Sequence, residues 1–378
     1  MKVVISIDSM KGSLSTIQAG NAARMGVLRA VPDAQVIVMP LADGGEGTTD
    51  ALLYALGGNL VAVDVVGPYG KPTKAQYGQL SDGKTAVMEM AQASGITLDP
   101  TREPLVATSY GVGQMILHAI HAGYREFVIG IGGSATNDGG VGMLQALGYS
   151  FCDQDGAEIP VGGEAVGKIA AISAEKVQPV LKECVFRIAC DVNNPLCGAQ
   201  GATAIYGPQK GVTEQTYPIL ENALSHFAAK TADFLGKDES NYPGVGAAGG
   251  LGFAFKTYLN ATLRSGVGLI LEAMKLEAQM DAVDYVITGE GRLDQQTSMG
   301  KAPVGVAQLA KKHGATVVAI AGCVTDDAGG CNDAGIDAFF PILRRPCTLE
   351  EAVAISQATQ NVTDTVEQIF RLIKSLSH

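Results

Sequence analysis

The sequence predicts an α/β protein of two domains, in which both chain ends build one domain and the middle of the chain is inserted as the other. Three observations lead to this fold class. The 378 residues suffice for two domains of roughly 150 residues each. Strand-like and helix-like segments alternate at both ends, which is typical of a parallel sheet covered on both faces. The middle mixes hairpin-like strands with helices, as in a mixed α/β domain.

The N-terminal part alternates strand and helix twice. Apolar runs predict strands over residues 3–7 and 35–39. Ser15 followed three positions later by Gln18 has the spacing of a capping box, so a helix is expected from there to about residue 29. A further helix is expected over residues 48–56. This order is that of a strand–helix unit in a parallel sheet.

The C-terminal part continues the same alternation. Strands are expected at 285–288, 316–321 and 338–342, and a helix at 303–313. Apolar residues recur at three or four positions from 349 to 373, which predicts one long amphipathic helix at the end.

The middle of the chain starts with three strands of antiparallel character, at 61–66, 74–80 and 85–90, with Asp82-Gly83 as a hairpin turn. Further strands are expected at 126–129 and 186–190, and helices at 141–147 and 213–235. Hinges are expected near Gly57-Gly58 or Gly67-Pro68 and again near Met280. We therefore assign residues 1–65 plus 281–378 to the first domain and residues 66–280 to the inserted one.

Composition excludes several classes of protein. The net charge of -11 argues against a nucleic-acid-binding surface, which needs a basic face. No apolar run approaches the ~18 residues of a membrane span, and the apolar start is too short for a signal peptide. The seven cysteines are scattered, as in reduced thiols, so a cytoplasmic protein is expected. The sequence leaves open whether the chain forms a homo-oligomer.

The most informative motif is Gly-Ile-Gly-Gly-Ser-Ala-Thr-Asn-Asp-Gly-Gly at residues 130–140, between an expected strand and an expected helix. Such a turn brings backbone N–H groups close to an anion. The side chains of Ser134, Thr136, Asn137 and Asp138 are candidates for holding phosphate or magnesium. The alternative is an ordinary turn in which Asn137 or Asp138 caps a helix.

Two other glycine motifs match the residue spacing of known patterns but lack their structural context. Residues 78–85 have the spacing of a P-loop, but their flanks alternate like a hairpin. Residues 244–249 have the spacing of a dinucleotide fingerprint, but they follow a polar loop rather than a strand. Neither is expected to bind a nucleotide in the usual way.

Polar side chains follow several expected strands. Asp8, Ser9, Lys11 and Ser13 follow the first strand, where open α/β sheets bind ligands. Other clusters contain the residues Asp43, Glu46, Asp191, Lys210, Glu290, Arg292, Asp294 and Lys301. Carboxylates for a hard cation, a few cations and anion-binding backbone are the groups that phosphoryl transfer needs. Each cluster taken alone is also compatible with a surface turn or a salt-bridged loop.

Five motifs together closely resemble those of the bacterial glycerate kinase type I family. They are residues 8–11 (Asp-Ser-Met-Lys), 42–47, 130–140, 206–211 and 288–292, so the resemblance covers nearly the whole chain. It implies transfer of the γ-phosphate of ATP to D-glycerate with Mg²⁺, with 2-phosphoglycerate as the product. It also implies a flavodoxin-like or Rossmann-like domain built from both chain ends, with the active site in the cleft between two domains.

The resemblance and the motif positions together suggest roles for individual residues. Lys11, Arg292, Asp43 and Asp191 are the catalytic candidates, with either aspartate as acceptor of the hydroxyl proton. The remaining candidates fall into substrate-binding residues (Asp8, Ser9, Ser13, Glu46, Lys210), ATP phosphate-binding residues (Gly132, Gly133, Ser134, Thr136, Asn137, Lys301) and magnesium ligands (Asp138, Glu290).

Rival functions remain open at this stage. The nearest are a glycerate kinase that yields 3-phosphoglycerate and a kinase of a related hydroxy acid. A nucleotide-linked oxidoreductase would bind a nicotinamide dinucleotide tightly. The sequence argues against this function, because no dinucleotide-binding fingerprint follows the first strand. A metabolite sensor without catalysis would usually carry a DNA-binding or signalling module, and we find no such segment.

Overall fold

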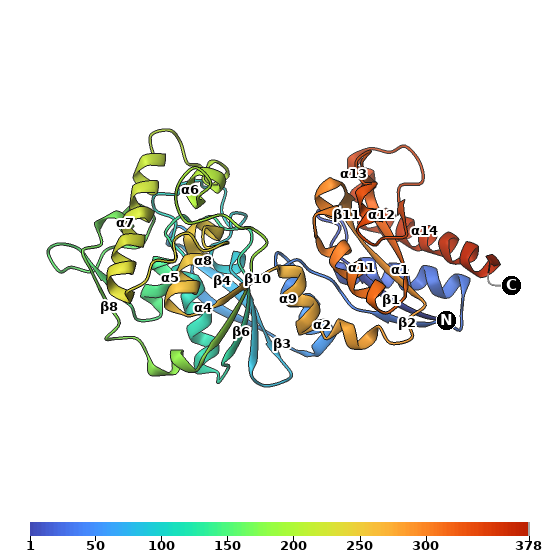
Figure 1. Ribbon diagram of the computed structural model, residues 1–378, viewed down its shortest axis with the longest axis horizontal. Coiled ribbons are helices and arrows are strands. Elements are labelled where there is room, and N and C mark those ends of the chain that lie inside the picture. The colour runs from blue at the N-terminus through green and yellow to red at the C-terminus, as the bar shows by residue number, and fades with distance from the viewer. Residues whose placement is uncertain (377–378) are drawn as a thin grey trace. The chain divides into compact units, whose positions relative to one another are not determined.

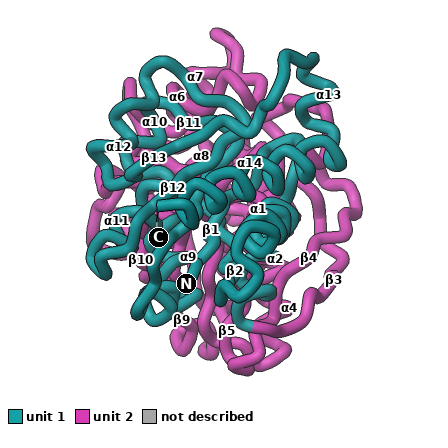
Figure 2. Tube along the Cα trace, turned by 90° about the vertical axis from the view of Figure 1, so that its right-hand side faces the viewer, with its two compact units in different colours: residues 1–43, 50–56, 267–378 teal, residues 44–49, 57–266 magenta. Residues whose placement is uncertain are grey.

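A computed structural model describes residues 1–376 and divides the chain into two compact units (Figure 2). Unit 1 contains residues 1–43, 50–56 and those from 267 onward, and unit 2 contains residues 44–49 and 57–266. The expected boundaries were 65/66 and 280/281. The strand β3 (Gly58–Val66) belongs to unit 2 because it pairs with its neighbour β4 (Pro72–Leu80) along its whole length.

The α/β fold class is confirmed, and unit 1 holds a five-stranded sheet in which every pairing is parallel. The strand order is β13-β12-β11-β1-β2. The strands are β1 (Lys2–Ile7), β2 (Gln35–Val38), β11 (Tyr285–Leu293), β12 (Thr316–Val324) and β13 (Ala338–Pro341). Both chain ends therefore contribute to one sheet.

Helices cover both faces of this sheet. Val3, Ile5 and Ile7 alternate onto one face, where they pack with α1 (Thr16–Ala30) and α14 (Ile355–Leu376), which run side by side (Figure 1). The capping box of Ser15 and Gln18 begins α1 as predicted. The other helices with residues in unit 1 are α2 (Thr48–Leu56), α9 (Gly266–Ala273), α10 (Gln295–Ser298), α11 (Ala302–Lys312), α12 (Gly330–Asp333) and α13 (Leu349–Val353), with a 3-10 turn at Leu276–Gln279.

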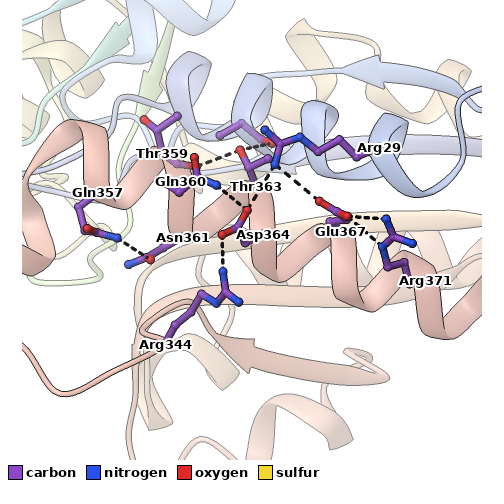
Figure 3. Close-up of polar contacts among 11 residues, drawn as sticks. Arg29, Arg344, Gln357, Thr359, Gln360, Asn361, Thr363, Asp364, Glu367 and Arg371 are labelled. Atoms are coloured by element: carbon purple, nitrogen blue, oxygen red, sulfur yellow. Dashed lines mark hydrogen bonds and ion pairs between the residues drawn. The ribbon is translucent and has the colours of Figure 1, made fainter.

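The prediction of one continuous C-terminal helix over 349–373 is wrong. Ala354 has φ -57° and ψ 123°, which ends α13 before α14 begins. On α14, Asp364 pairs with the guanidinium groups of both Arg29 and Arg344 (Figure 3). These ion pairs fasten α14 to α1 and to the segment that follows β13, two parts far apart in the sequence.

Unit 2 contains a six-stranded mixed sheet with the order β10-β9-β6-β5-β4-β3. The predicted antiparallel hairpins are confirmed, because β3 pairs with β4 and β4 with β5 in that sense, whereas the remaining pairs are parallel. The other strands of this sheet are β5 (Thr85–Glu89), β6 (Glu126–Gly130), β9 (Val185–Ala189) and β10 (Thr262–Arg264).

Helices and loops surround this sheet. The helices are α3 (Ala91–Ser94), α4 (Tyr110–His121), α5 (Val141–Ala146), α6 (Ala202–Tyr206), α7 (Tyr217–Leu235) and α8 (Ala247–Tyr258). A small antiparallel pair, β7 (Ser150–Cys152) with β8 (Ala171–Ser173), and 3-10 turns at Ala165–Lys168, Pro179–Glu183 and Pro208–Lys210 complete the unit. Among residues 1–376, no helix combines the length and the apolar character that crossing a membrane requires.

Candidate active site

The sheet of unit 1 reverses its direction of winding between β1 and β11. From β1 the chain passes through α1 to β2 at one edge, whereas β11 leads to β12 and β13 toward the other. Open α/β sheets bind ligands outside the carboxyl ends of the strands at such a point. The backbone N–H of Asp8 donates to the carbonyl oxygen of Gly289 at 2.8 Å. The segment after β1 therefore lies beside the polar half of β11.

Charged side chains gather at this edge and line one cavity of about 670 Å³. The Nζ atom of Lys11 is 3.8 Å from Oδ2 of Asp43. Asp294 lies between two cations, 3.5 Å from Nε of Arg292 and 3.8 Å from Nζ of Lys301. The predicted site residues that line this cavity are Asp8, Ser9, Lys11, Ser13, Asp43, Glu290, Arg292 and Lys301.

The three cations of this cavity are accessible. The side chains of Lys11, Arg292 and Lys301 are 77%, 65% and 42% exposed, and each has a carboxylate within 4 Å. Exposed ion pairs of this kind are weak, because water screens them and ordering two side chains costs entropy. An anionic ligand can therefore replace the carboxylate partner at little cost.

The carboxylates behind these cations are less exposed. Asp8 is only 6% exposed, and burial raises its pKa to about 7, with the charges of Asp43 and Glu290 adding to the effect. Burial also raises the pKa of Glu290, whose Oε1 accepts a hydrogen bond from Thr297 Oγ1 at 2.7 Å. The cavity thus concentrates negative charge that a bound cation would relieve.

A second group of candidate residues lies at the carboxyl ends of the parallel strands of unit 2. The short segment 44–49 packs across the ends of β6 and β9. A Cβ atom on Gly130 would lie 1.9 Å from the carbonyl oxygen of Gly44, so only glycine fits at the end of β6. Glu46 on this segment is exposed. Asp191, just beyond β9, is also exposed and accepts a hydrogen bond from the Gly266 N–H at 2.8 Å.

Sequence reasoning missed Glu89, which holds the segment 44–49 in place. Glu89 ends β5 and is 5% exposed. Its carboxylate accepts hydrogen bonds from the N–H groups of Thr49, at 2.8 Å, and Gly47, at 3.4 Å, near the start of α2. A carboxylate within the otherwise apolar strand sequence Ala-Val-Met-Glu-Met was the available signal, since a buried glutamate needs donors.

Most of the glycine-rich loop 130–140 is inaccessible. Gly132 and Gly133 are exposed and Ser134 is 7% exposed, whereas Thr136, Asn137 and Asp138 are fully buried. The start of α8 covers them. The N–H of Gly139 donates to Gly249 O at 2.9 Å, and a Cβ on Gly249 would lie 2.0 Å from Thr136 O. Only the tip at Gly132-Gly133 presents its backbone to a ligand.

The prediction of Asp138 as a magnesium ligand does not fit this structure. Its Oδ2 accepts hydrogen bonds from the N–H and Oγ of Ser109, at 2.7 and 2.8 Å, and from the N–H of Gly142. Its Oδ1 accepts from the N–H of Gly140 at 3.1 Å. Burial raises the pKa of Asp138, and these donors act in the opposite direction. Asp138 joins the starts of α4 and α5 and has no oxygen facing solvent.

The burial of Lys210 does not fit its predicted substrate-binding role either. Lys210 is 1% exposed, and its Nζ donates to the carbonyl oxygen of Thr136 at 2.7 Å. Burial lowers its pKa to about 7. The side chain supports the glycine-rich loop from inside unit 2 and is shielded from solvent.

These contacts predict a structural role for Asp138 that can be measured. Asp138→Ala should lower the free energy of unfolding by roughly 3–5 kcal/mol, because buried donors lose their acceptor. The measurement is denaturant unfolding followed by circular dichroism, with the exposed Asp155→Ala as the control. If the variant kept full stability and lost only magnesium affinity, a ligand role would replace the structural one.

The two glycine motifs that match the spacing of a P-loop and of a dinucleotide fingerprint have structural roles. Residues 78–85 form the end of β4, the hairpin turn and the start of β5, so they are no P-loop. Residues 244–249 follow a loop and lead into the start of α8 that covers the glycine-rich loop. Neither motif has the strand–turn–helix context that a P-loop or a dinucleotide-binding fingerprint requires.

Comparisons with known proteins agree on one family. The sequence model described as the glycerate kinase family matches residues 3–374. The glycerate 2-kinase of Escherichia coli (strain K12) is 46% identical over 373 residues, covering 97% of this chain and 98% of that protein. The glycerate kinase of Bacillus subtilis (strain 168) is 44% identical, covering 99% and 98%. A crystal structure from Salmonella typhimurium LT2, described as a glycerate kinase 2, superimposes with a TM-score of 0.91 at 42% identity, covering 100% and 99%.

Proposed function

Because this chain belongs to the glycerate kinase family, we propose that it transfers the γ-phosphate of ATP to D-glycerate and forms 2-phosphoglycerate. The 2-position is chosen because the relative from Escherichia coli, which covers nearly the full length of this chain, is a glycerate 2-kinase. The alternative product, 3-phosphoglycerate, differs only in which hydroxyl group attacks.

The cavity of unit 1 is the observation that supports this proposal most directly. It combines three accessible cations with carboxylates and has no cysteine–histidine or serine–histidine pair among its lining residues. Phosphoryl transfer depends on positioning and charge neutralisation and needs no covalent nucleophile. We assign Lys11, Arg292 and Lys301 to the negative charges of the phosphates and of the glycerate carboxylate.

Magnesium fits the carboxylates of this cavity. The charges of Asp43 and Glu290 add to the burial that raises the pKa of Asp8, so a cation beside Asp8 is electrostatically favoured. Among residues 1–376 no three His, Cys, Asp or Glu side chains form a preformed metal site. That agrees with Mg²⁺, which usually takes one or two carboxylates and completes its shell with phosphates and water. The ion would neutralise phosphate charge, and Asp8 and Glu290 are the carboxylates we propose to hold it.

The attacking hydroxyl group must lose its proton during transfer. Asp43, beside Lys11 in unit 1, and Asp191 in unit 2 are accessible carboxylates at strand ends, and we propose them as alternative proton acceptors. The exposed backbone of Gly132 and Gly133 is assigned to an anionic group of a substrate. Thr136, Asn137, Asp138 and Lys210 are assigned to the support of that loop.

The test is ADP release by the purified protein with ATP, Mg²⁺ and D-glycerate, followed by phosphorus NMR of the product. We expect turnover that depends on D-glycerate and a resonance of 2-phosphoglycerate. A resonance of 3-phosphoglycerate would correct the position of transfer and leave the kinase intact. ADP release that is independent of every hydroxy acid tried would overturn the kinase assignment.

A further inference from the structure

The cavity of unit 1 has a second, apolar part that the reaction with a small acid does not explain. Its charged residues come from the segments that follow β1 and β2, from β11 and from the segment that follows β11. Another part of the lining comes from residues 342–353, which run from the end of β13 through α13, and includes the side chains Ile342, Leu343, Leu349, Ala352 and Val353. Leu349 is 79% exposed and Leu343 is 40% exposed, so apolar surface faces solvent there.

The size of the cavity matters for its occupant. At about 670 Å³ it lies within the range of roughly 300–1,000 Å³ that is typical of sites for drug-sized ligands. D-Glycerate has three carbons, each bonded to oxygen, and offers no apolar surface to bury. A ligand that matches the whole cavity has several negative charges at one end and a flat, weakly polar group at the other.

The apolar lining is held in place independently of any ligand. The N–H of Ile342 donates to Ala321 O at 2.8 Å, which continues the pairing of β13 with β12. Arg344, two residues after Ile342, pairs with Asp364 on α14 (Figure 3). Thr348 and Glu351 form a capping box that begins α13. A preformed wall lowers the ordering cost of binding.

We propose that residues 342–353 form the pocket for the base of ATP, so that unit 1 binds the base and the phosphates of the same nucleotide. The base lies against Leu349 and Val353, and the phosphates extend toward Lys11, Arg292 and Lys301. This inference rests on the proposed function for the identity of the ligand. It also moves nucleotide binding from the largely buried loop 130–140 of unit 2 to the accessible cavity of unit 1.

The test compares two ligands that share the phosphates and differ in the base. Calorimetric titration of the full chain with Mg-ATP and with magnesium tripolyphosphate, both without D-glycerate, measures binding separately from catalysis. Leu349→Ala should weaken ATP binding by about five- to tenfold, because part of a leucine contact with the base is lost, and should leave tripolyphosphate binding unchanged. Leu376→Ala is the matched control, since Leu376 is 77% exposed on α14 and does not line the cavity.

A second variant and a second readout address the same pocket. Ala352→Phe would fill the pocket and should weaken ATP binding but not tripolyphosphate binding. In the unmodified protein, Cys347 is exposed and lines the apolar part, so ATP should slow its alkylation more than tripolyphosphate does. The rate of modification at this single thiol is measured by mass spectrometry.

The outcomes separate this inference from the proposed function. Equal losses for ATP and tripolyphosphate in Leu349→Ala, or unchanged ATP binding in both variants, would overturn the base pocket even in an active kinase. Selective loss of ATP binding would support the pocket even if D-glycerate were not phosphorylated, in which case only the acceptor would need to be revised.

Discussion

Lys11→Ala is expected to lower kcat/KM for glycerate phosphorylation by about 10²- to 10³-fold, the usual loss when one preorganised charge-stabilising group is removed. The ammonium group lies at the carboxyl end of β1, its side chain is 77% exposed, and its partner Asp43 is 3.8 Å away. Its charge is thus available to a phosphate or carboxylate. The measurement is steady-state ADP release at saturating and limiting concentrations of each substrate.

The control for Lys11 is another lysine in an exposed ion pair. Lys237 pairs with Glu239 at 3.0 Å in unit 2, and its side chain is 46% exposed. Lys237→Ala should leave kcat/KM unchanged, because neither Lys237 nor Glu239 lines the cavity of unit 1 or is a candidate site residue. Lys11→Arg should restore part of the activity, since it returns the charge but not the compact ammonium geometry. Near-wild-type kcat/KM in Lys11→Ala would remove Lys11 from the reaction.

The largest expected effect of pH on stability concerns Asp8. Its pKa is raised from 3.8 to about 7, mainly by burial and then by the charge of Asp43. The folded state therefore holds the proton more tightly than the unfolded state does. The stabilisation from this proton is complete below pH 4 and is lost as the pH rises through about 7. Three pKa units correspond to at most about 4 kcal/mol.

Asp8→Asn should abolish this dependence on pH, because asparagine has no proton to lose in this range. At pH 8 the variant should be more stable than the wild type by about 2–4 kcal/mol. At pH 4 the two should be nearly equal. Activity should fall in the variant, so stability and function would change in opposite directions, as is common for strained active-site residues.

Hydrogen exchange of the β1 and β11 amides measures this effect within unit 1, since both strands belong to its sheet. Asp33 is exposed in the same unit, and Asp33→Asn serves as the control. This substitution should leave the pH dependence of amide protection unaltered. If the pH dependence of amide protection in Asp8→Asn matched that of the wild type from pH 4 to pH 8, Asp8 would not be the group that makes stability depend on pH.

Local patterns in the sequence predicted most elements correctly because they depend on neighbouring residues. The capping box of Ser15 and Gln18, the turn at Asp82-Gly83 and the strand before Gly130 all formed as expected. The long C-terminal helix was predicted wrongly at Ala354, where apolar periodicity continues across a break in the backbone. Alanine favours helices, so nothing local marks this break.

The sequence by itself also determined which residue types end each strand, and hence that phosphoryl transfer was the favoured chemistry. Only the tertiary structure decided which of these side chains a ligand can reach. Asp138 and Lys11 both lie in a connection between a strand and a helix. Asp138 is nevertheless fully buried, whereas the Lys11 side chain is 77% exposed. The difference arises because residues 247–250, more than 100 positions further along the chain, pack onto the loop around Asp138. Accessibility depends on such long-range packing, which no local pattern encodes.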